Sequence, residues 1–226
     1  MKRALIVASG LRGIFGHNFF YTQMVQRELE QRGFEVTVFI NKNTPANLLQ
    51  ETDYKAVFSL GTYDSIPSNG KYPDLIYTYL QAGIYAYDLQ AAINQLDHKD
   101  FDFIFFHTLV DFELIGINRY LSKNKFGGHL FIMQRQSPRF ENISKWKAFL
   151  HPYLRIKPHY LKAINRKLKK RFTLLTDSEI LSDDYAIVFP HRIVTAPIPL
   201  NAPFFQPIET DNSENSLFLR HNLPKE

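Results

Sequence analysis

The sequence contains no cysteine, which excludes disulfide bonds and thiolate chemistry for its 226 residues. It also has no long apolar run, because no window approaches the roughly 18 apolar residues that a membrane-spanning helix needs. Met1-Lys2-Arg3 leads straight into an apolar run of about seven residues, which is too short for the core of a secretion signal. Together these absences predict a cytoplasmic protein.

Several nucleotide-binding signatures are missing as well. The chain has no G-K-[ST] sequence, so a P-loop is excluded on pattern. Three glycines follow the first apolar run, but Gly10, Gly13 and Gly16 are spaced G-x-x-G-x-x-G instead of the dinucleotide pattern G-x-G-x-x-G. Asn41 stands where a dinucleotide fold carries an acidic residue. A nicotinamide or flavin site is therefore disfavoured, and we expect no cofactor.

The sequence motifs give little support for a metal site or for a serine hydrolase. Asp100-Phe101-Asp102 matches a D-x-D signature, but it precedes an apolar run, whereas metal-binding carboxylates are expected after a strand. A solvated turn is the favoured interpretation. No H-x-x-x-H pair or EF-hand spacing is present, and we expect no metal. A G-x-S-x-G nucleophile elbow is also missing.

What the chain does contain is an alternation of strand and helix patterns, with 45% hydrophobic and 15% aromatic residues to fill a core. This alternation predicts an α/β fold, a Rossmann-like parallel sheet flanked by helices. Strands are expected at 4–8, 36–40, 55–60, 103–106, 130–133, 172–175 and 192–196. Helices are expected at 18–32, 85–96, 109–121 and within 145–171, and a short one after Pro45 that runs through Leu48 and Leu49. A single turn is expected near 179 and an irregular excursion at 61–79.

The composition changes from Pro197 onward, where four prolines precede the polar run Glu209–Ser216. We therefore expect one domain over residues 1–200. Residues 201–226 are expected to be an interdomain linker and the start of a further domain.

The loop after the first strand is the first candidate site. In open parallel sheets the ligand lies at the carboxyl ends of the strands, and this loop forms part of that edge. Backbone N–H groups near Gly13, Gly16 and His17, at a helix N-terminus, are suited to phosphate or sugar oxygens. The alternative is a flexible turn without a ligand.

Two later strand ends carry further polar candidates. His107 ends a buried strand and precedes Asp111, and it is a candidate general base or hydrogen-bond donor, or else a structural histidine. Gln134, Arg135 and Arg139 follow the next strand, where the two arginines are suited to bidentate contact with phosphate. An exposed basic loop is the alternative there.

The stretch Lys145–Arg171 interleaves ten lysines and arginines with aromatic and aliphatic residues, in a chain of net charge +5 and pI near 9.2. This pattern is typical of a segment at an anionic bilayer, and it predicts a peripheral location at the inner face of the membrane. A long surface helix with a solvated face is the alternative. Nucleic-acid binding is disfavoured.

Several segments also match a known family when taken in order. They are Arg3–Val7 with the loop to Gly16, Glu28–Val38, Phe101–His107, Thr176–Glu179, Val194–Leu200 with Phe205–Pro207, and Leu219–Pro224. The series resembles the N-terminal half of GT-B glycosyltransferases of the large retaining family 4. The last segment resembles the opening of the family's second domain.

The resemblance implies two Rossmann-like domains facing across a cleft, the first for an acceptor and the second for a nucleotide-sugar donor. Gly16 would approach the donor diphosphate, while His107, Gln134 and Arg135 would line the acceptor side. The implied reaction is metal-free, retaining glycosyl transfer to an acceptor hydroxyl, in the synthesis of a cell-surface glycan or glycolipid. A helix dipole and basic side chains would stabilise the leaving diphosphate.

The chain departs from the family pattern at two places. Gln134-Arg135 stands where many members carry a histidine, and the glycine loop is loosened to Gly13-Ile14-Phe15-Gly16. No two glutamates are separated by seven residues, so the donor-side E-x7-E element is absent and these residues alone are expected to be inactive. The alternatives are a non-catalytic binding module, one subunit of a split enzyme, or a phosphosugar enzyme whose acid–base pair the sequence does not show.

Overall fold

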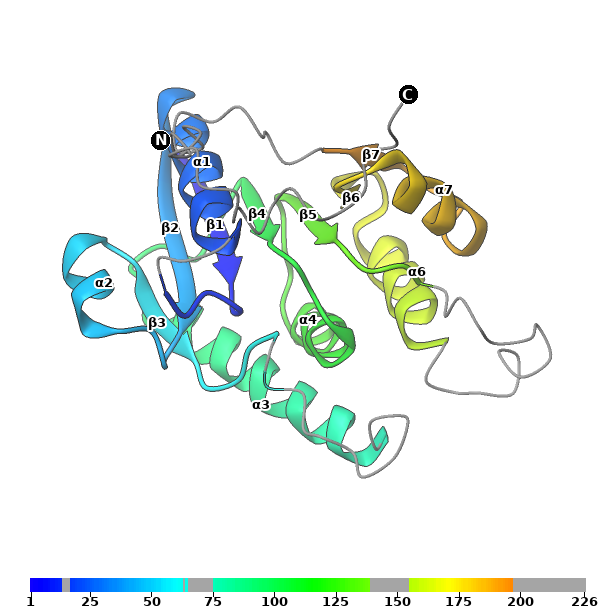
Figure 1. Ribbon diagram of the computed structural model, residues 1–226, viewed down its shortest axis with the longest axis horizontal. Helices are drawn as coiled ribbons and strands as arrows, with labels where there is room; N and C mark the ends of the chain where they lie inside the picture. Colours follow the sequence, from blue (N-terminus) through cyan, green and yellow to red (C-terminus); the bar gives the residue numbers. More distant parts are fainter. Residues whose placement is uncertain (14–16, 63, 65–74, 139–154, 197–226) are drawn as a thin grey trace, which may run out of the picture.

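Seven parallel strands form one sheet through the middle of the molecule (Figure 1). The computed structural model describes residues 1–13, 17–62, 64, 75–138 and 155–196. The strands lie in the order β3-β2-β1-β4-β5-β6-β7, and each neighbouring pair is parallel. The predicted fold class, a Rossmann-like parallel sheet flanked by helices, is confirmed.

The strands correspond closely to the apolar runs of the sequence. Their bounds are β1 Lys2–Ala8, β2 Phe34–Asn41, β3 Lys55–Phe58, β4 Phe103–Phe106, β5 His129–Gln134, β6 Phe172–Thr176 and β7 Ile193–Thr195. Because β2 and β3 lie on one side of β1 and β4 to β7 on the other, the direction of winding reverses between β1 and β4. In open α/β sheets the ligand crevice forms at this switch point, outside the carboxyl ends of the strands.

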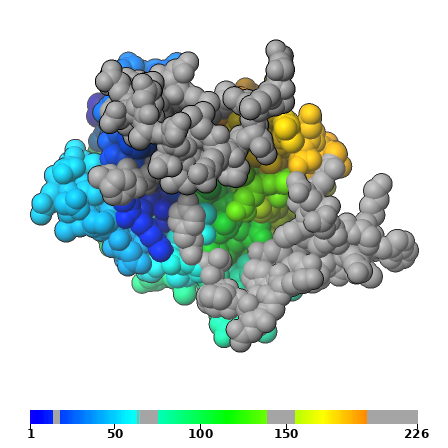
Figure 2. All heavy atoms as spheres, in the orientation of Figure 1, coloured from blue at the N-terminus to red at the C-terminus, as the bar shows by residue number. Residues whose placement is uncertain are grey.

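Helices cover both faces of the sheet (Figure 1). On one face α3 (Leu75–Asn94), α4 (Asp111–Lys123) and α6 (Ile156–Leu168) lie side by side. On the other face α1 (His17–Gln31) packs on β1 and β2. The short helix α2 (Ala46–Glu51) forms the projection at the left of the space-filling view (Figure 2). After α6 a single 3-10 turn, η2 (Lys169–Arg171), leads into β6, and α7 (Glu179–Val188) packs on β6 and β7.

The core explains why the strands are apolar at nearly every position. In β1, Leu5 and Val7 belong to the core under α3, α4 and α6, whereas Ala4 and Ile6 belong to the core under α1. Successive side chains of a strand point to opposite faces, so a sheet covered on both faces needs apolar residues throughout. The same burial holds for β4, where Ile104, Phe105 and Phe106 are each 2% exposed.

Three helices differ from the sequence-based expectation. Helix α3 begins at Leu75, inside the segment that was expected to be an irregular excursion. Pro158 was expected to interrupt the helical region 145–171, but it lies in the first turn of helix α6, where no intrahelical N–H bond is lost. Helix α7 has ten residues instead of one turn, and the Ser178 side chain accepts a hydrogen bond from the Leu181 N–H at its start (3.4 Å).

The described helices do not include one with both the length and the apolarity needed to cross a bilayer. The D-x-D carboxylates lie at the amino edge of the sheet, where Asp102 accepts a hydrogen bond from the Arg3 N–H (2.9 Å). The described residues also contain no group of three or more His, Asp or Glu that could hold a metal ion.

Candidate functional site

Loops after β1 and β4 meet at the switch point of the sheet. The His107 N–H donates to the Val7 carbonyl (2.9 Å) and joins the ends of these two strands. Directly after β1 come Ser9 and Gly10, and directly after His107 comes Thr108. The sequence-based expectation that His107 and the loop after the first strand share one edge therefore agrees with the described residues.

Three side chains form a buried group at this edge, which we call the Glu113 cluster: Ser9, Thr62 and Glu113. Glu113 lies in the first turn of α4, and its side chain is fully buried. Its carboxylate accepts hydrogen bonds from the Ser9 hydroxyl, from the Val110 N–H (2.8 Å) and from the Thr62 hydroxyl (3.4 Å). The cluster thus joins the loops after β1 and β3 to the start of α4.

Burial dominates the electrostatics of this cluster. Removal from water raises the pKa of Glu113 to about 7, although the hydrogen bonds from Ser9, Val110 and Thr62 favour the charged form. Burial, together with the nearby charge of Glu113, also raises the pKa of the Tyr85 hydroxyl well above its ordinary value. A carboxyl group that titrates near neutral pH at the switch point is typical of functional sites.

Four further residues form what we call the Tyr21 cluster: Tyr21, His107, Arg135 and Asp177. The rings of Tyr21 and His107 stack with centroids 4.8 Å apart and planes inclined by 15°. Burial raises the pKa of Tyr21 to about 12, while the charge of Arg135 lowers it and that of Asp177 raises it. Arg135 Nε donates to Asp177 Oδ2 (3.0 Å), so the ends of β5 and β6 are connected.

Accessibility differs within the Tyr21 cluster. The imidazole of His107 is only 2% exposed because Tyr21 lies over it. Arg135 and Asp177 are 19% and 20% exposed, so they present polar atoms to solvent at the edge. Solvent at this edge therefore contacts the arginine–carboxylate pair, whereas Tyr21 covers His107.

The remaining predicted site residues are placed as follows. Asp111 is the first residue of α4 and is buried. Burial lowers the pKa of Lys157, and the negative charge of Asp111 raises it. Gln134 ends β5, where its Oε1 accepts from the Tyr185 hydroxyl (3.1 Å) while its buried Nε2 has no hydrogen-bond partner among the described residues. His17 is the first residue of α1. A Cβ built on Gly13 would meet no described atom within 4 Å. Gly16 and Arg139 lie outside the described residues.

Thr108, at the same edge of the sheet, has a strained backbone conformation. Its φ of 51° lies in the left-handed region, which β-branched residues rarely adopt. Its carbonyl accepts from the Thr62 hydroxyl (3.1 Å), which ties it to the Glu113 cluster. Strain held in place by surrounding contacts at a strand end is a feature of ligand-binding sites.

Relief of this strain is a testable consequence. We expect Thr108→Gly to raise the free energy of unfolding by about 1 kcal/mol, because glycine adopts positive φ without a Cβ clash. Chemical denaturation measures the change. Lys169→Gly is the matched control, since Lys169 has a φ of 55° far along the chain, after α6. A loss of stability in Thr108→Gly together with a gain in Lys169→Gly would contradict the assignment of strain to Thr108.

The sequence pointed to His107, Gln134, Arg135 and Asp111 but missed the Glu113 cluster. Glu113 carried one signal, an acidic residue in the first turn of an apolar helix, which is common for helices in general. Ser9 and Thr62 carried none, because their contacts with Glu113 join residues far apart in the chain.

Comparison with known proteins adds no family to this picture. No protein-family model matches the chain, and no curated protein matches it significantly.

Proposed function

We propose that the edge at the switch point binds a hydroxylated acceptor, and that the domain is the acceptor side of a glycosyltransferase that uses a nucleotide-sugar donor. The observation that supports this best is the convergence of polar side chains from the ends of β1, β4, β5 and β6 at the reversal of the strand order. In open α/β sheets, this position is where small polar ligands bind.

The side chains at the edge suit hydroxyl groups. Arg135 donates and Asp177 accepts, and the pair is held in one orientation by its own hydrogen bond. The exposed Gln136 adds an amide whose Oε1 faces Lys157 Nζ (3.4 Å). A saccharide hydroxyl is both donor and acceptor, so such mixed groups bind it without leaving a buried charge unpaired.

The donor part of the proposal rests on the ordered resemblance of the sequence to GT-B enzymes. In it, the N-terminus of α1 faces the donor diphosphate, because the first N–H groups of a helix lack intrahelical partners and favour anions. The glycosyl unit passes from the diphosphate oxygen to the acceptor hydroxyl oxygen, and the hydroxyl proton passes to the departing diphosphate. The nucleoside diphosphate leaves with the bonding electrons.

Ligand binding at this edge can be observed at the histidines themselves. We expect the imidazole signals of His107 in an NMR spectrum of histidine-labelled protein to shift when simple alkyl glycosides are added. Asp177→Asn is expected to weaken that binding about tenfold, because one charged acceptor is lost. The signals of His107 are assigned with His107→Gln.

His129 is the matched control for this titration. It begins β5 at the opposite edge of the same sheet, where its ring nitrogen bonds the Thr173 hydroxyl (2.9 Å). Its signals are expected to stay in place. Equal shifts at both histidines, or no shift with any glycoside, would refute an acceptor site at the switch point. Glycoside binding without transfer of label from nucleotide sugars by the natural full-length protein would favour a non-catalytic binding module.

A further inference from the structure

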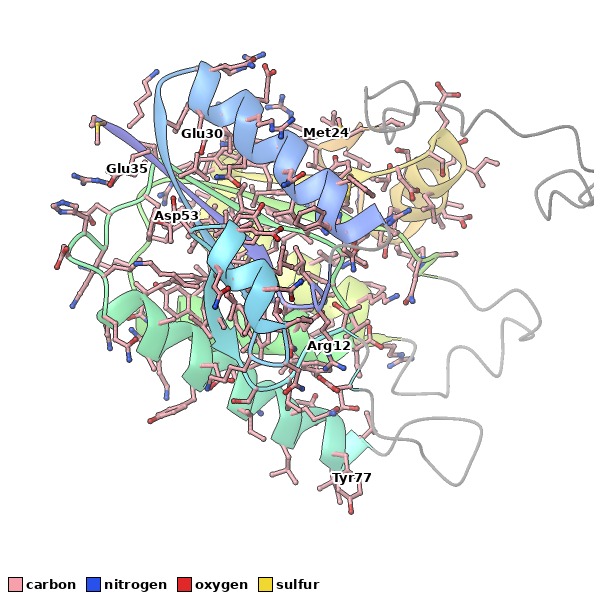
Figure 3. All side chains as sticks on the ribbon, turned by 60° about the vertical axis from the view of Figure 1, so that its left-hand side comes forward. Arg12, Met24, Glu30, Glu35, Asp53 and Tyr77 are labelled. Atoms are coloured by element: carbon pink, nitrogen blue, oxygen red, sulfur yellow. The ribbon has the colours of Figure 1, made fainter. Side chains whose placement is uncertain are left out.

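Helix α3 carries a stripe of apolar side chains that are exposed to solvent. Ile76, Leu80, Ile84 and Tyr87 are 68%, 59%, 45% and 73% exposed. Their spacing of four, four and three residues places them on one side of the helix. Tyr77 extends away from the body of the protein near the start of the helix (Figure 3). We call these five residues the α3 stripe.

The opposite side of α3 is largely apolar in the second half of the helix. Tyr85, Leu89 and Ala92 are buried in the core against the sheet and α4. The only charged residue of the helix, Asp88, is 7% exposed and accepts a hydrogen bond from the Ser59 N–H (2.7 Å). Large apolar residues on two sides of one helix are normally covered on both sides, so the α3 stripe indicates a contact beyond the core that the described residues form.

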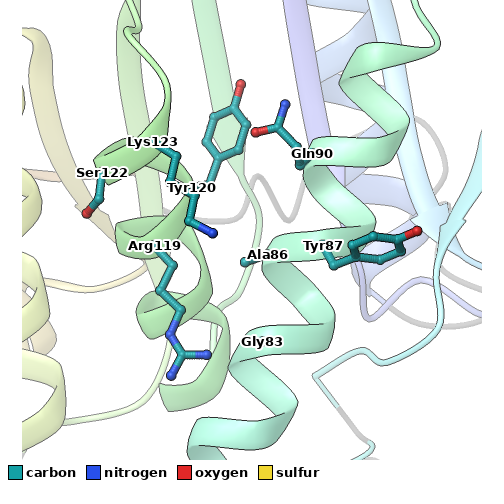
Figure 4. Close-up of a pocket in the computed structure, with 8 residues that line it drawn as sticks. All are labelled: Gly83, Ala86, Tyr87, Gln90, Arg119, Tyr120, Ser122 and Lys123. Carbon is teal, nitrogen blue, oxygen red and sulfur yellow. The ribbon is translucent and has the colours of Figure 1, made fainter.

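The apolar surface continues into the space between α3 and α4. A groove of about 510 Å³ is lined by Gly83, Ala86 and Tyr87 of α3 and by Arg119, Tyr120 and Lys123 of α4, among others (Figure 4). An adjoining hollow of about 540 Å³ lies over Ile76, Tyr79 and Leu80. Arg119 is shared by both, and its guanidinium lies 5.7 Å from the centre of the Tyr79 ring.

The charges of this helical layer have one sign at the surface. The three carboxylates of α3, α4 and α6 are Asp88, Asp111 and Glu113, and all are buried. The cations of the same helices are at least partly exposed, and they are Arg119, Lys123, Lys157, Lys162, Arg166 and Lys167. An anionic partner fits the surface of α3, α4 and α6, because every accessible charge on these three helices is positive. The exposed carboxylates Glu179 and Asp183 of the same face belong to α7, which packs on β6 and β7.

We propose that the α3 stripe docks on an anionic lipid bilayer, with Arg119 and Lys123 facing the head groups. Apolar and tyrosine side chains bordered by basic ones are the composition of segments that lie in a membrane interface. This surface is not the one that the sequence suggested. In α6, the described part of Lys145–Arg171, the apolar residues Ile156, Leu161, Ile164 and Leu168 are buried in the core. Among its basic residues, Lys167 bonds Asn118 of α4 through its Nζ.

A second copy of the chain fits this surface less well. Two such layers packed face to face would bring cations of both copies together without an accessible carboxylate between them. The oligomeric state of the protein is therefore measured alongside vesicle binding, to distinguish a second copy from a bilayer.

Vesicle binding tests the proposal directly. We expect the protein to sediment with vesicles of phosphatidylcholine containing about one third phosphatidylglycerol, and less with phosphatidylcholine alone. Tyr87→Glu and Ile76→Glu are each expected to lower the partition coefficient roughly tenfold, since a charge replaces a buried apolar group. The double variant Arg119→Gln, Lys123→Gln is expected to lower it by a similar factor and to weaken its dependence on salt.

Ile187→Glu is the matched control, because Ile187 is 69% exposed on α7 and lies outside the layer. It is expected to bind vesicles like the unmodified protein. Equal losses in Ile187→Glu and Tyr87→Glu, or no binding to anionic vesicles, would overturn the proposal. A dimer in light scattering that Tyr87→Glu dissociates would assign the stripe to a second copy. The vesicle assay contains no sugar, so an absence of vesicle binding would leave the proposed acceptor site untouched, and an absence of glycoside binding would leave the bilayer proposal untouched.

Discussion

Glu113→Gln is expected to stabilise the protein by about 3 kcal/mol at about pH 8 and to flatten the pH dependence of its stability between about pH 4.5 and 7. The neutral amide resembles the protonated carboxyl group. Its oxygen accepts from the Val110 N–H, and its NH₂ group donates to the oxygens of Ser9 or Thr62. The variant therefore keeps the hydrogen bonds of the Glu113 cluster and removes the buried charge.

The direction follows from the pKa of Glu113, which burial raises from 4.5 to about 7 in the folded protein. Below about pH 4.5 the group is protonated in both states and contributes no difference. Between about pH 4.5 and 7 the unfolded chain loses this proton while the folded protein keeps it, so stability falls as the pH rises. Above about pH 7 the loss is complete and constant.

Urea denaturation at a series of pH values measures this effect. Glu179→Gln is the matched control, because Glu179 occupies the first turn of α7 but is exposed to solvent. It is expected to leave the shape of the pH profile unchanged. Parallel profiles for the unmodified protein and Glu113→Gln would show that Glu113 does not carry a raised pKa. Glu113→Ala is expected to be destabilised at every pH, since it leaves the Val110 N–H without its acceptor.

The sheet could be predicted from the sequence because a parallel strand covered on both faces is apolar throughout. Phe103–Phe106 and Leu130–Met133 were recognisable as such runs, and both are buried strands here. Helix α3 was mislocated for a related reason. Its first half exposes large apolar residues such as Ile76 and Leu80 and buries the polar Thr78 and Gln81, so it lacks the single core-facing apolar stripe by which a surface helix is recognised.

The candidate site was predictable only in part. His107 and Arg135 could be placed at one edge because each directly follows an apolar run or ends it, and parallel strands bring their carboxyl ends together. The partners of these residues could not be predicted. The stacking of Tyr21 on His107 and the pairing of Asp177 with Arg135 depend on how α1 and the end of β6 pack, which no local pattern encodes.

Gly61 shows most clearly how closely the loops at the carboxyl edge approach one another. A Cβ built on this residue would lie 2.0 Å from the Ser9 carbonyl oxygen and 2.7 Å from Asn41 Nδ2. The same amide nitrogen of Asn41 donates to the Ser9 carbonyl (3.1 Å). The loops after β1, β2 and β3 therefore meet at one point with no room for a methyl group, directly beside the Glu113 cluster.

Gly61→Ala is expected to lower the free energy of unfolding by about 3 kcal/mol, because the clash is with backbone atoms that cannot rotate away. The displacement of Ser9 is also expected to disturb its hydrogen bond to Glu113 and so to change the pH dependence of stability. Chemical denaturation of Gly61→Ala and of Gly127→Ala measures both effects. A Cβ on Gly127 would meet no described atom within 4 Å, so that variant controls for the loss of a glycine in a loop. Equal stability of the two variants would mean that the approach of Gly61 to Ser9 does not hold in solution.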